Sequence, residues 1–174
     1  MKKKNKALVL MNMGGPRSKD ELKLFLNNMF RDKNIVSMKS NFLRYCLAKI
    51  IVLSRLNKAW ENYVKIGGAS PLNSITTKLV DKLNVKLENY EVKQVMRYTP
   101  PFAQEACDSL QALNIEEVVL LPLYPQYSTT TTKSSLEDFM NVKNFNFKTR
   151  IIEPFYKNDV FNTIIIEDIK KSVL

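Results

Sequence analysis

Histidine is absent from the 174-residue sequence. The chain therefore carries no imidazole, the side chain that ordinarily titrates near neutral pH and serves as a base or metal ligand. Cysteine occurs only twice, as Cys46 and Cys107, which are too far apart for a metal-ligand motif and too few for a disulfide framework. We expect both to be reduced, buried or half-buried thiols of a cytoplasmic protein.

Long apolar runs are also lacking, so no stretch reaches the 18 or more residues that a membrane-spanning helix needs. The lysine-rich start resembles a signal peptide only briefly, because its apolar run ends at Gly14, Gly15 and Pro16; a buried first strand fits better. Net charge is +10. Solvated lysines explain this charge most simply, and the alternatives are attraction to an anionic ligand, a membrane surface or nucleic acid.

Short β-branched and leucine-rich runs alternate with longer helical patterns along the chain. This alternation predicts an α/β fold, an open four-stranded parallel sheet with helices on both faces. The expected strands span 6–13, 91–98, 117–121 and 148–152, and the expected helices span 18–29, 42–56, 71–87, 100–113, 128–142 and 158–173, the fourth with Pro100 and Pro101 in its first turn. The third strand has no alternation and should be buried on both faces. Ser18 and Glu21 fit a reciprocal capping box.

The segment from Phe42 to Leu56 is apolar around most of a helix, although Arg44, Lys49 and Arg55 interrupt it. A helix that covers one sheet face needs only a narrower apolar stripe. The segment is therefore either buried on two sides, or it turns one side to a ligand or a membrane surface.

The segment LLPLYPQYSTTTTKSS follows directly from the third strand, at residues 120–135. Its prolines end the strand, because proline has no backbone donor for a sheet ladder. The position between a strand end and a helix start is where open α/β sheets place their ligands. Ser128, Thr130 and Thr131 either cap the helix alone or also bind an anion at its N-terminus.

Four motifs occur in one order: MNMGGP at 11–16, IGGASPL at 66–72, MRYTPP at 96–101 and LYPQYSTTTTKSSL at 123–136. Together they resemble ferrochelatase, the enzyme that inserts ferrous iron into a porphyrin, from about residue 7 to the end of the chain. The resemblance implies a Rossmann-like chelatase half-domain. It also implies that Fe²⁺ and protoporphyrin IX, or a related porphyrin, are substrates and that no cofactor is required.

The resemblance transfers a set of porphyrin contacts to this chain. Arg55 matches an arginine that meets a propionate, a task that suits the planar guanidinium, whereas without the resemblance it would be a solvated charge. Many family members carry a histidine where this chain has Pro100. The implied porphyrin-binding residues are Met13, Arg55, Tyr63, Ser70, Arg97, Tyr98, Tyr124, Ser128, Thr130 and Thr131. No residue of this chain is assigned a catalytic or metal-ligating role.

We expect residues 1–174 to form the N-terminal chelatase domain, with residues 31–66 as a helical lip insertion. Family members continue into a second domain that delivers a histidine and a glutamate to the metal, and this chain lacks it. The chain alone should bind porphyrin weakly and insert iron poorly. The expected partners are porphyrin, the missing domain and a membrane surface at the lip. A non-catalytic porphyrin or heme carrier is the alternative; a nucleic-acid-binding domain is disfavoured, because the lysines scatter.

Overall fold

The parallel sheet predicted from the sequence is confirmed in a computed structural model, which describes residues 4–173. Residues 1–3 and 174 of the predicted domain lie outside this range. The strands lie in the order β2-β1-β3-β4, and every neighbouring pair is parallel. Their bounds are Lys6–Asn12 for β1, Tyr90–Met96 for β2, Glu117–Pro122 for β3 and Lys148–Ile151 for β4.

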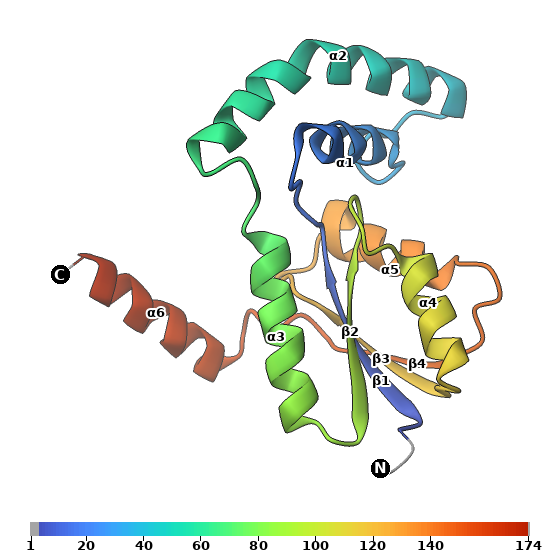
Figure 1. Ribbon diagram of the computed structural model, residues 1–174, viewed down its shortest axis with the longest axis vertical. Coiled ribbons are helices and arrows are strands. Elements are labelled where there is room, and N and C mark those ends of the chain that lie inside the picture. Colours follow the sequence, from blue (N-terminus) through green and yellow to red (C-terminus); the bar gives the residue numbers. More distant parts are fainter. Residues whose placement is uncertain (1–3, 174) are drawn as a thin grey trace.

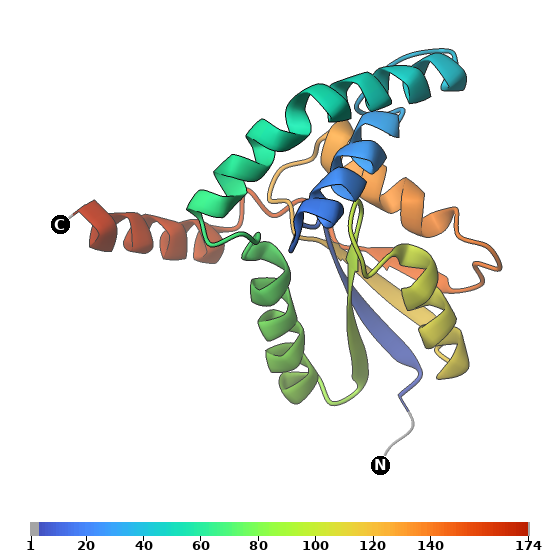
Figure 2. The same ribbon diagram turned by 45° about the horizontal axis from the view of Figure 1, so that its top comes forward.

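Helices flank this sheet on both sides, with α3 on one side and α4 on the other (Figure 1). The helices are α1 (Lys19–Arg31), α2 (Asn41–Lys65), α3 (Leu72–Lys86), α4 (Ala103–Ala112), the π-helical turn η1 (Thr129–Lys133), α5 (Ser134–Met140) and α6 (Asp159–Val173). Helices α1 and α2 lie one above the other beyond the end of the sheet, and α6 points away from the rest of the molecule (Figures 1 and 2). No helix within residues 4–173 is long and apolar enough to cross a membrane.

The start of α1 confirms half of the predicted capping box. The Glu21 backbone N–H donates to the Ser18 hydroxyl over 3.2 Å, which satisfies one free donor of the first turn. The reciprocal contact was predicted wrongly. The Glu21 carboxylate instead accepts from the Arg17 backbone N–H at 2.9 Å, and it also pairs with the Arg17 guanidinium. A charged partner holds this carboxylate more strongly than a neutral backbone donor would.

Most predicted element ends lie within two residues of the observed ends, and the end of the second helix is the largest departure. Helix α2 continues to Lys65, nine residues beyond the predicted end at Leu56. Strand β2 ends at Met96, two residues early, because the chain turns into Pro100 and Pro101. These prolines precede α4 and do not form its first turn.

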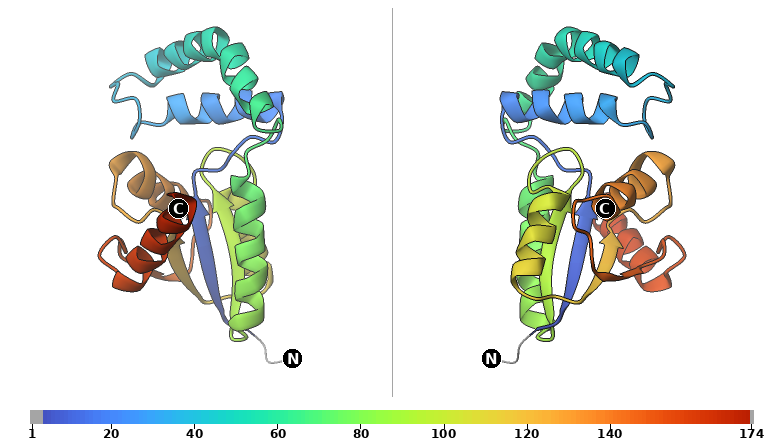
Figure 3. Two further views of the ribbon diagram at one scale, coloured as in Figure 1. Left: turned by 90° about the vertical axis from the view of Figure 1, so that its left-hand side faces the viewer. Right: turned by 90° about the vertical axis from the view of Figure 1, so that its right-hand side faces the viewer.

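Two separate groups of buried side chains stabilise the fold. The larger lies between the sheet and helices α4 and α5, and includes Val9, Leu120, Cys107 and Phe139. The smaller lies between α1 and α2 and is built on Leu22, Leu26 and Val52. Helix α2 therefore packs on α1 along one side, and Figure 3 shows this pair clear of the sheet. The thiols are free as predicted, Cys107 buried and Cys46 half-buried.

Strand β3 is less buried than predicted. Val118 and Leu120 have no exposed surface, whereas Val119 and Leu121 on the opposite face are half-buried. On that second face α3 packs mainly against β2, at the edge of the sheet, and leaves β3 less covered. The strand thus alternates in burial, although its sequence is apolar throughout.

Candidate functional site

The carboxyl ends of the strands bring several of the predicted site residues to one edge of the sheet. Asn12 pairs in register with Met96, and Met11 with Pro122, so the residues that follow these strands meet at the same edge. Met13 follows β1, and its carbonyl accepts from the Tyr98 backbone N–H at 3.0 Å. This placement agrees with the sheet geometry that the sequence predicted, and the porphyrin contacts themselves stay a prediction.

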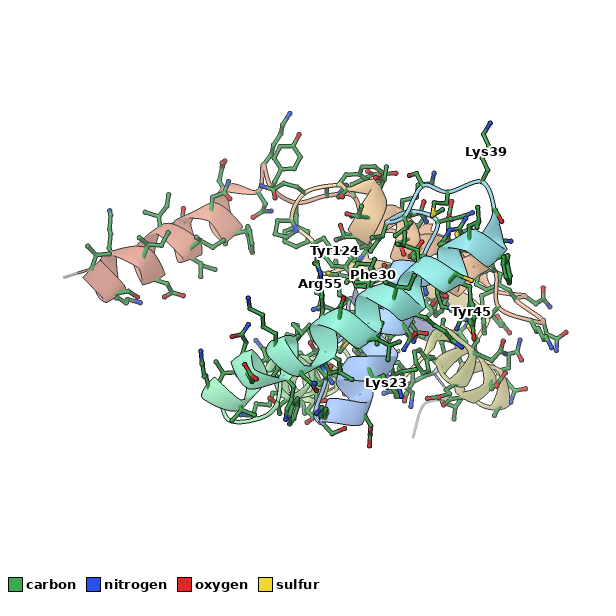
Figure 4. The ribbon with its side chains drawn as sticks, turned by 90° about the horizontal axis from the view of Figure 1, so that it is seen from above. Lys23, Phe30, Lys39, Tyr45, Arg55 and Tyr124 are labelled. Atoms are coloured by element: carbon green, nitrogen blue, oxygen red, sulfur yellow. The ribbon has the colours of Figure 1, made fainter. Side chains whose placement is uncertain are left out.

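Helix α2 carries two further predicted contacts above this edge. Arg55 is exposed, and among residues 4–173 no hydrogen bond or ion pair engages its guanidinium. In the view from above, Arg55 on α2 and Phe30 on α1 lie close to Tyr124, which belongs to the segment after β3 (Figure 4). Tyr63 packs against the α1–α2 group of apolar side chains, and this burial raises the pKa of its phenol.

Ser70 lies against the turn between β1 and α1. Its backbone N–H donates to the Pro16 carbonyl at 2.8 Å, and its hydroxyl accepts from the Leu72 backbone N–H at 3.3 Å. A Cβ atom on Gly15 would collide with the Ser70 side chain, so only glycine allows this close approach. The start of α3 is thereby fixed to the end of β1.

Tyr124 and the hydroxyl run form the third part of the edge. The Tyr124 phenol lies 3.1 Å from the Ser135 hydroxyl, and burial raises the pKa of Tyr124 to about 12. The Ser128 hydroxyl accepts from the Thr130 backbone N–H at 3.2 Å and lies 2.9 Å from the Thr130 hydroxyl. Ser128 therefore caps η1, which both interpretations of the hydroxyl run include, and anion binding at this turn stays a prediction. Thr130 is exposed, and Thr131 is half-buried.

The porphyrin contact predicted for Tyr98 requires a correction, because the Tyr98 ring has no exposed surface. The phenol donates to the Asp32 carboxylate at 2.9 Å, and Phe25 packs edge-on against the ring. Burial raises the pKa of this phenol well above its ordinary value. Tyr98 is thus a core residue that joins α1 to the sheet, and in this structure it offers no surface to a porphyrin.

Arg97 is half-buried, and its guanidinium is already engaged on every nitrogen. Its Nε donates to Ser134 at 2.8 Å, one terminal nitrogen pairs with Asp32 at 3.0 Å, and the other pairs with Asp138 at 3.0 Å. Each terminal nitrogen keeps a second N–H group, but a propionate that accepted from it would lie beside two carboxylates of like charge. Arg97 therefore serves here as the centre of an internal ion-pair network, which competes with its predicted porphyrin contact.

Asp32 is the central residue that the sequence prediction missed. It follows α1 directly and is 5% exposed. Its carboxylate also accepts from the Ser134 hydroxyl and from the Asn34 backbone N–H, the latter at 2.8 Å. The only sequence signal was an aspartate at the end of a helix, where the helix dipole disfavours a negative charge unless donors compensate it.

A pocket of about 850 Å³ lies between α1, α4 and α5, with Asp32, Arg97 and Asp138 among its lining residues. Arg97 is the only one of the ten predicted porphyrin-binding residues in this lining. The structure therefore gathers most of the predicted residues at the sheet edge and on α2, outside this pocket. Within residues 4–173, no group of three or more cysteine, aspartate or glutamate residues is arranged to hold a metal ion.

A twisted parallel sheet with aromatic and polar side chains beyond the carboxyl ends of its strands defines an α/β protein of the class that binds ligands at that edge. Comparison with known families specifies the class further. The ferrochelatase family model matches residues 5–174, and the chain belongs to this family.

Individual relatives agree with this assignment. The ferrochelatase of a Nitratiruptor species is 50% identical over 171 residues, which cover 97% of this chain and 55% of the relative. The ferrochelatase of Sulfurimonas denitrificans is 49% identical over 174 residues, which cover 98% of this chain and 55% of that protein. A ferrochelatase of Helicobacter pylori is 43% identical over 172 residues, which cover 97% of this chain and 51% of that protein. The chain thus spans about half the length of the curated relatives it matches.

Proposed function

We propose that this chain is the porphyrin-binding half of a ferrochelatase that inserts Fe²⁺ into protoporphyrin IX for heme biosynthesis. The observation that carries the proposal is the exposed Arg55 guanidinium, which no residue within 4–173 engages and which lies above Tyr124 (Figure 4). A free guanidinium is suited to bind a carboxylate through two parallel hydrogen bonds. Porphyrin propionates are such carboxylates.

Metallation of a porphyrin requires the loss of two pyrrole protons and a distortion of the ring toward the metal. In this proposal Arg55 and Ser70 fix the propionates, and Met13 and Tyr63 contact the ring, so that the half-site orients the macrocycle. The proton acceptor and the iron ligand come from the remaining part of the enzyme. Iron is a substrate in this scheme, and no resident cofactor takes part.

We place this function in the cytoplasm, with contact between α2 and a membrane surface. The exposed apolar side chains Phe42, Leu43, Ile50 and Leu53 lie along the first half of α2. A basic helix with exposed apolar residues suits the interface of an anionic membrane.

A second candidate function is a non-catalytic porphyrin or heme carrier. It is suggested by the resemblance itself, because every residue that the resemblance assigns in this chain is a porphyrin contact. The two functions make the same prediction for porphyrin binding and opposite predictions for metal insertion.

Fluorescence titration and an anaerobic Fe²⁺ insertion assay therefore test the proposal together. We expect the chain alone to bind protoporphyrin IX weakly and to insert iron slowly, and we expect insertion to rise when the second half of the Nitratiruptor relative is co-expressed with it. Binding without any such rise would favour the carrier. Turnover by the chain alone at the rate of a full-length relative would contradict the division of labour proposed here.

Arg55→Ala should weaken protoporphyrin binding about ten- to hundredfold, because a hydrogen bond to a charged group contributes roughly 1.5–3 kcal/mol. Lys86→Ala is the control, since Lys86 is an exposed cation at the end of α3, close to the start of β2 and so at the opposite edge of the sheet. The dissociation constants of both variants follow from fluorescence titration at two salt concentrations. Equal affinities for the two variants would remove Arg55 from the site.

A further inference from the structure

The pocket between α1, α4 and α5 has no part in the function proposed above. Its volume of about 850 Å³ is typical of sites that bind small organic molecules. Part of its lining is apolar and includes Leu24, Phe102 and Val142. The charged residues of the lining are Arg31, Asp32, Lys33, Arg44, Arg97, Glu137 and Asp138. The kind of ligand that fits depends on which of these charges are balanced within the chain.

The three carboxylates of the lining all have cationic partners. Asp32 and Asp138 both pair with Arg97, each at 3.0 Å. Glu137 pairs with Lys33 at 3.2 Å. These five residues balance one another, so the pocket offers no free acidic group to a cationic ligand.

The two remaining arginines of the lining have no acidic partner among residues 4–173. The terminal nitrogens of Arg44 donate to neutral carbonyls, that of Met38 at 2.6 Å and that of Arg31 at 3.5 Å. The buried Nε of Arg44 has no hydrogen-bond partner. The Arg31 guanidinium lies 4.2 Å from the centre of the Tyr45 ring, and no ion pair engages it. Two unbalanced positive charges therefore lie side by side where α1 ends and α2 begins.

A third cation adds to the positive potential at this end of α2. Lys49 lies 4.7 Å from the centre of the same Tyr45 ring. Lys49, through a hydrogen bond and its charge, and Arg31, through its charge, lower the pKa of the Tyr45 phenol. Nearby positive charge favours the ionised form of an acid, so the same surroundings favour a bound anion.

We propose that this pocket binds a small organic carboxylate, whose anionic group pairs with Arg31 and Arg44. Its apolar body contacts Leu24, Phe102 and Val142. Both guanidiniums keep N–H groups that no residue accepts from, and a planar guanidinium can hold a carboxylate through two hydrogen bonds. A doubly charged phosphate fits less well, because the three carboxylates of the lining repel it more strongly.

This site is separate from the sheet edge proposed for porphyrin, and the inference does not rest on the proposed function. Leu24, Asn28 and Arg31 lie on one side of α1 and line the pocket. Leu22 and Leu26 lie on another side and pack against α2. Helix α1 therefore lies between the pocket and the group of apolar side chains that it shares with α2.

Titration of the full 174-residue chain with benzoate, a single carboxylate on an aromatic ring, tests the proposal. In the isotope-labelled chain, amide chemical shifts should change saturably at Arg31, Arg44 and Gln104. Benzyl alcohol, which lacks the charge, and inorganic phosphate, which lacks the ring, should each bind about tenfold more weakly or less. Equal binding of either compound, or shifts confined to other parts of the chain, would contradict the proposal.

Arg44→Gln should weaken benzoate binding about tenfold or more, because hydrogen bonds between charged groups are lost. Arg55→Gln is the matched control, since it removes the same charge from the same helix, about 16 Å from Arg44 along the axis. Figure 4 shows Arg55 well apart from Tyr45 on α2. This control should bind benzoate as the wild type does, and a loss of binding there would move the carboxylate to the sheet edge and overturn the inference.

Leu24→Glu gives a second test at a side chain that is 38% exposed, so the fold should tolerate it. The new negative charge in the pocket should weaken benzoate binding at least as much as Arg44→Gln does, and unchanged affinity would refute the site. Saturating benzoate should also raise the unfolding temperature of the wild type, because a ligand that binds only the folded state stabilises it. Unfolding without ligand shows that each variant is folded. The porphyrin titration can fail while benzoate binding stands.

Discussion

Asp32→Asn should lower the free energy of unfolding by about 3 kcal/mol, because it removes the charged acceptor that Arg97 and the buried Tyr98 phenol share. Arg97 would keep only Asp138 as a charged partner, and the Tyr98 phenol would lose its ionised acceptor. Urea unfolding measures the change. Asp168→Asn is the matched control: Asp168 pairs with Lys171 on α6 with a side chain that is 71% exposed, and its loss should change little.

The pH dependence of this difference gives a second measurement. Burial alone would raise the pKa of Asp32, but hydrogen bonds from Ser134 and Asn34 and the charge of Arg97 hold that pKa below its ordinary value. The ionised Asp32 therefore contributes stability above the unfolded pKa of about 3.9, and this contribution is lost as the pH falls through the lower folded pKa. The difference in the free energy of unfolding between wild type and Asp32→Asn should therefore become smaller below about pH 4.

Asp138 responds to pH in the opposite direction, because burial raises its pKa. The protonated Asp138 carboxyl stabilises the fold at low pH, and this stabilisation is lost as the pH rises through the pKa of the folded state. The difference in the free energy of unfolding between wild type and Asp32→Asn, taken at each pH, is therefore more informative than the pH dependence of either protein alone. A gap that stays constant from pH 7 to pH 3 would show that the Asp32 carboxylate does not stabilise the fold by its charge.

Gly14→Ala should be the second severe change, with a loss of about 3 kcal/mol. Gly14 has φ +87°, a conformation that side chains with a Cβ rarely adopt. An added Cβ would also collide with the hydroxyl of Thr99, which is fully buried, and would lie 3.0 Å from the Met96 Cβ. Strain and collision therefore act together at the edge where β1 meets the end of β2.

Gly67→Ala separates these two effects. Gly67 has φ +95°, but an added Cβ there would meet no atom within 4 Å. This variant should lose only the strain energy, about 1 kcal/mol. Thermal or urea unfolding of both variants gives the comparison. Equal losses would mean that Thr99 yields to the new methyl group and that close packing at Gly14 is unimportant.

The sheet could be predicted because its signals are local. Each strand is a short apolar run between turn residues, and the right-handed connections of parallel strands leave few possible arrangements. All four strands were placed within two residues of their observed ends. The same logic placed Met13 and Tyr124 at one edge, since parallel strands end together.

Side-chain direction could not be predicted from these local signals. Arg97 and Tyr98 come from the expected strand end, yet both turn toward Asp32, which lies 65 and 66 residues earlier in the chain. Such a contact depends on how α1 packs on the sheet, and no spacing in the sequence reports it. The π-helical turn at Thr129–Lys133 was likewise unforeseen within the predicted helix.

The two groups of buried side chains have no residue in common, and this has a consequence for how the protein opens. We expect helices α1 and α2 to form their own cooperative unit, since polar contacts such as those of Asp32 and Asn28, and the packing of Phe25 on Tyr98, join them to the sheet. Amide protons of this unit should exchange with solvent through sub-global opening events that leave the sheet protected. We therefore expect α2, which carries Arg55, to open and close while the sheet stays folded.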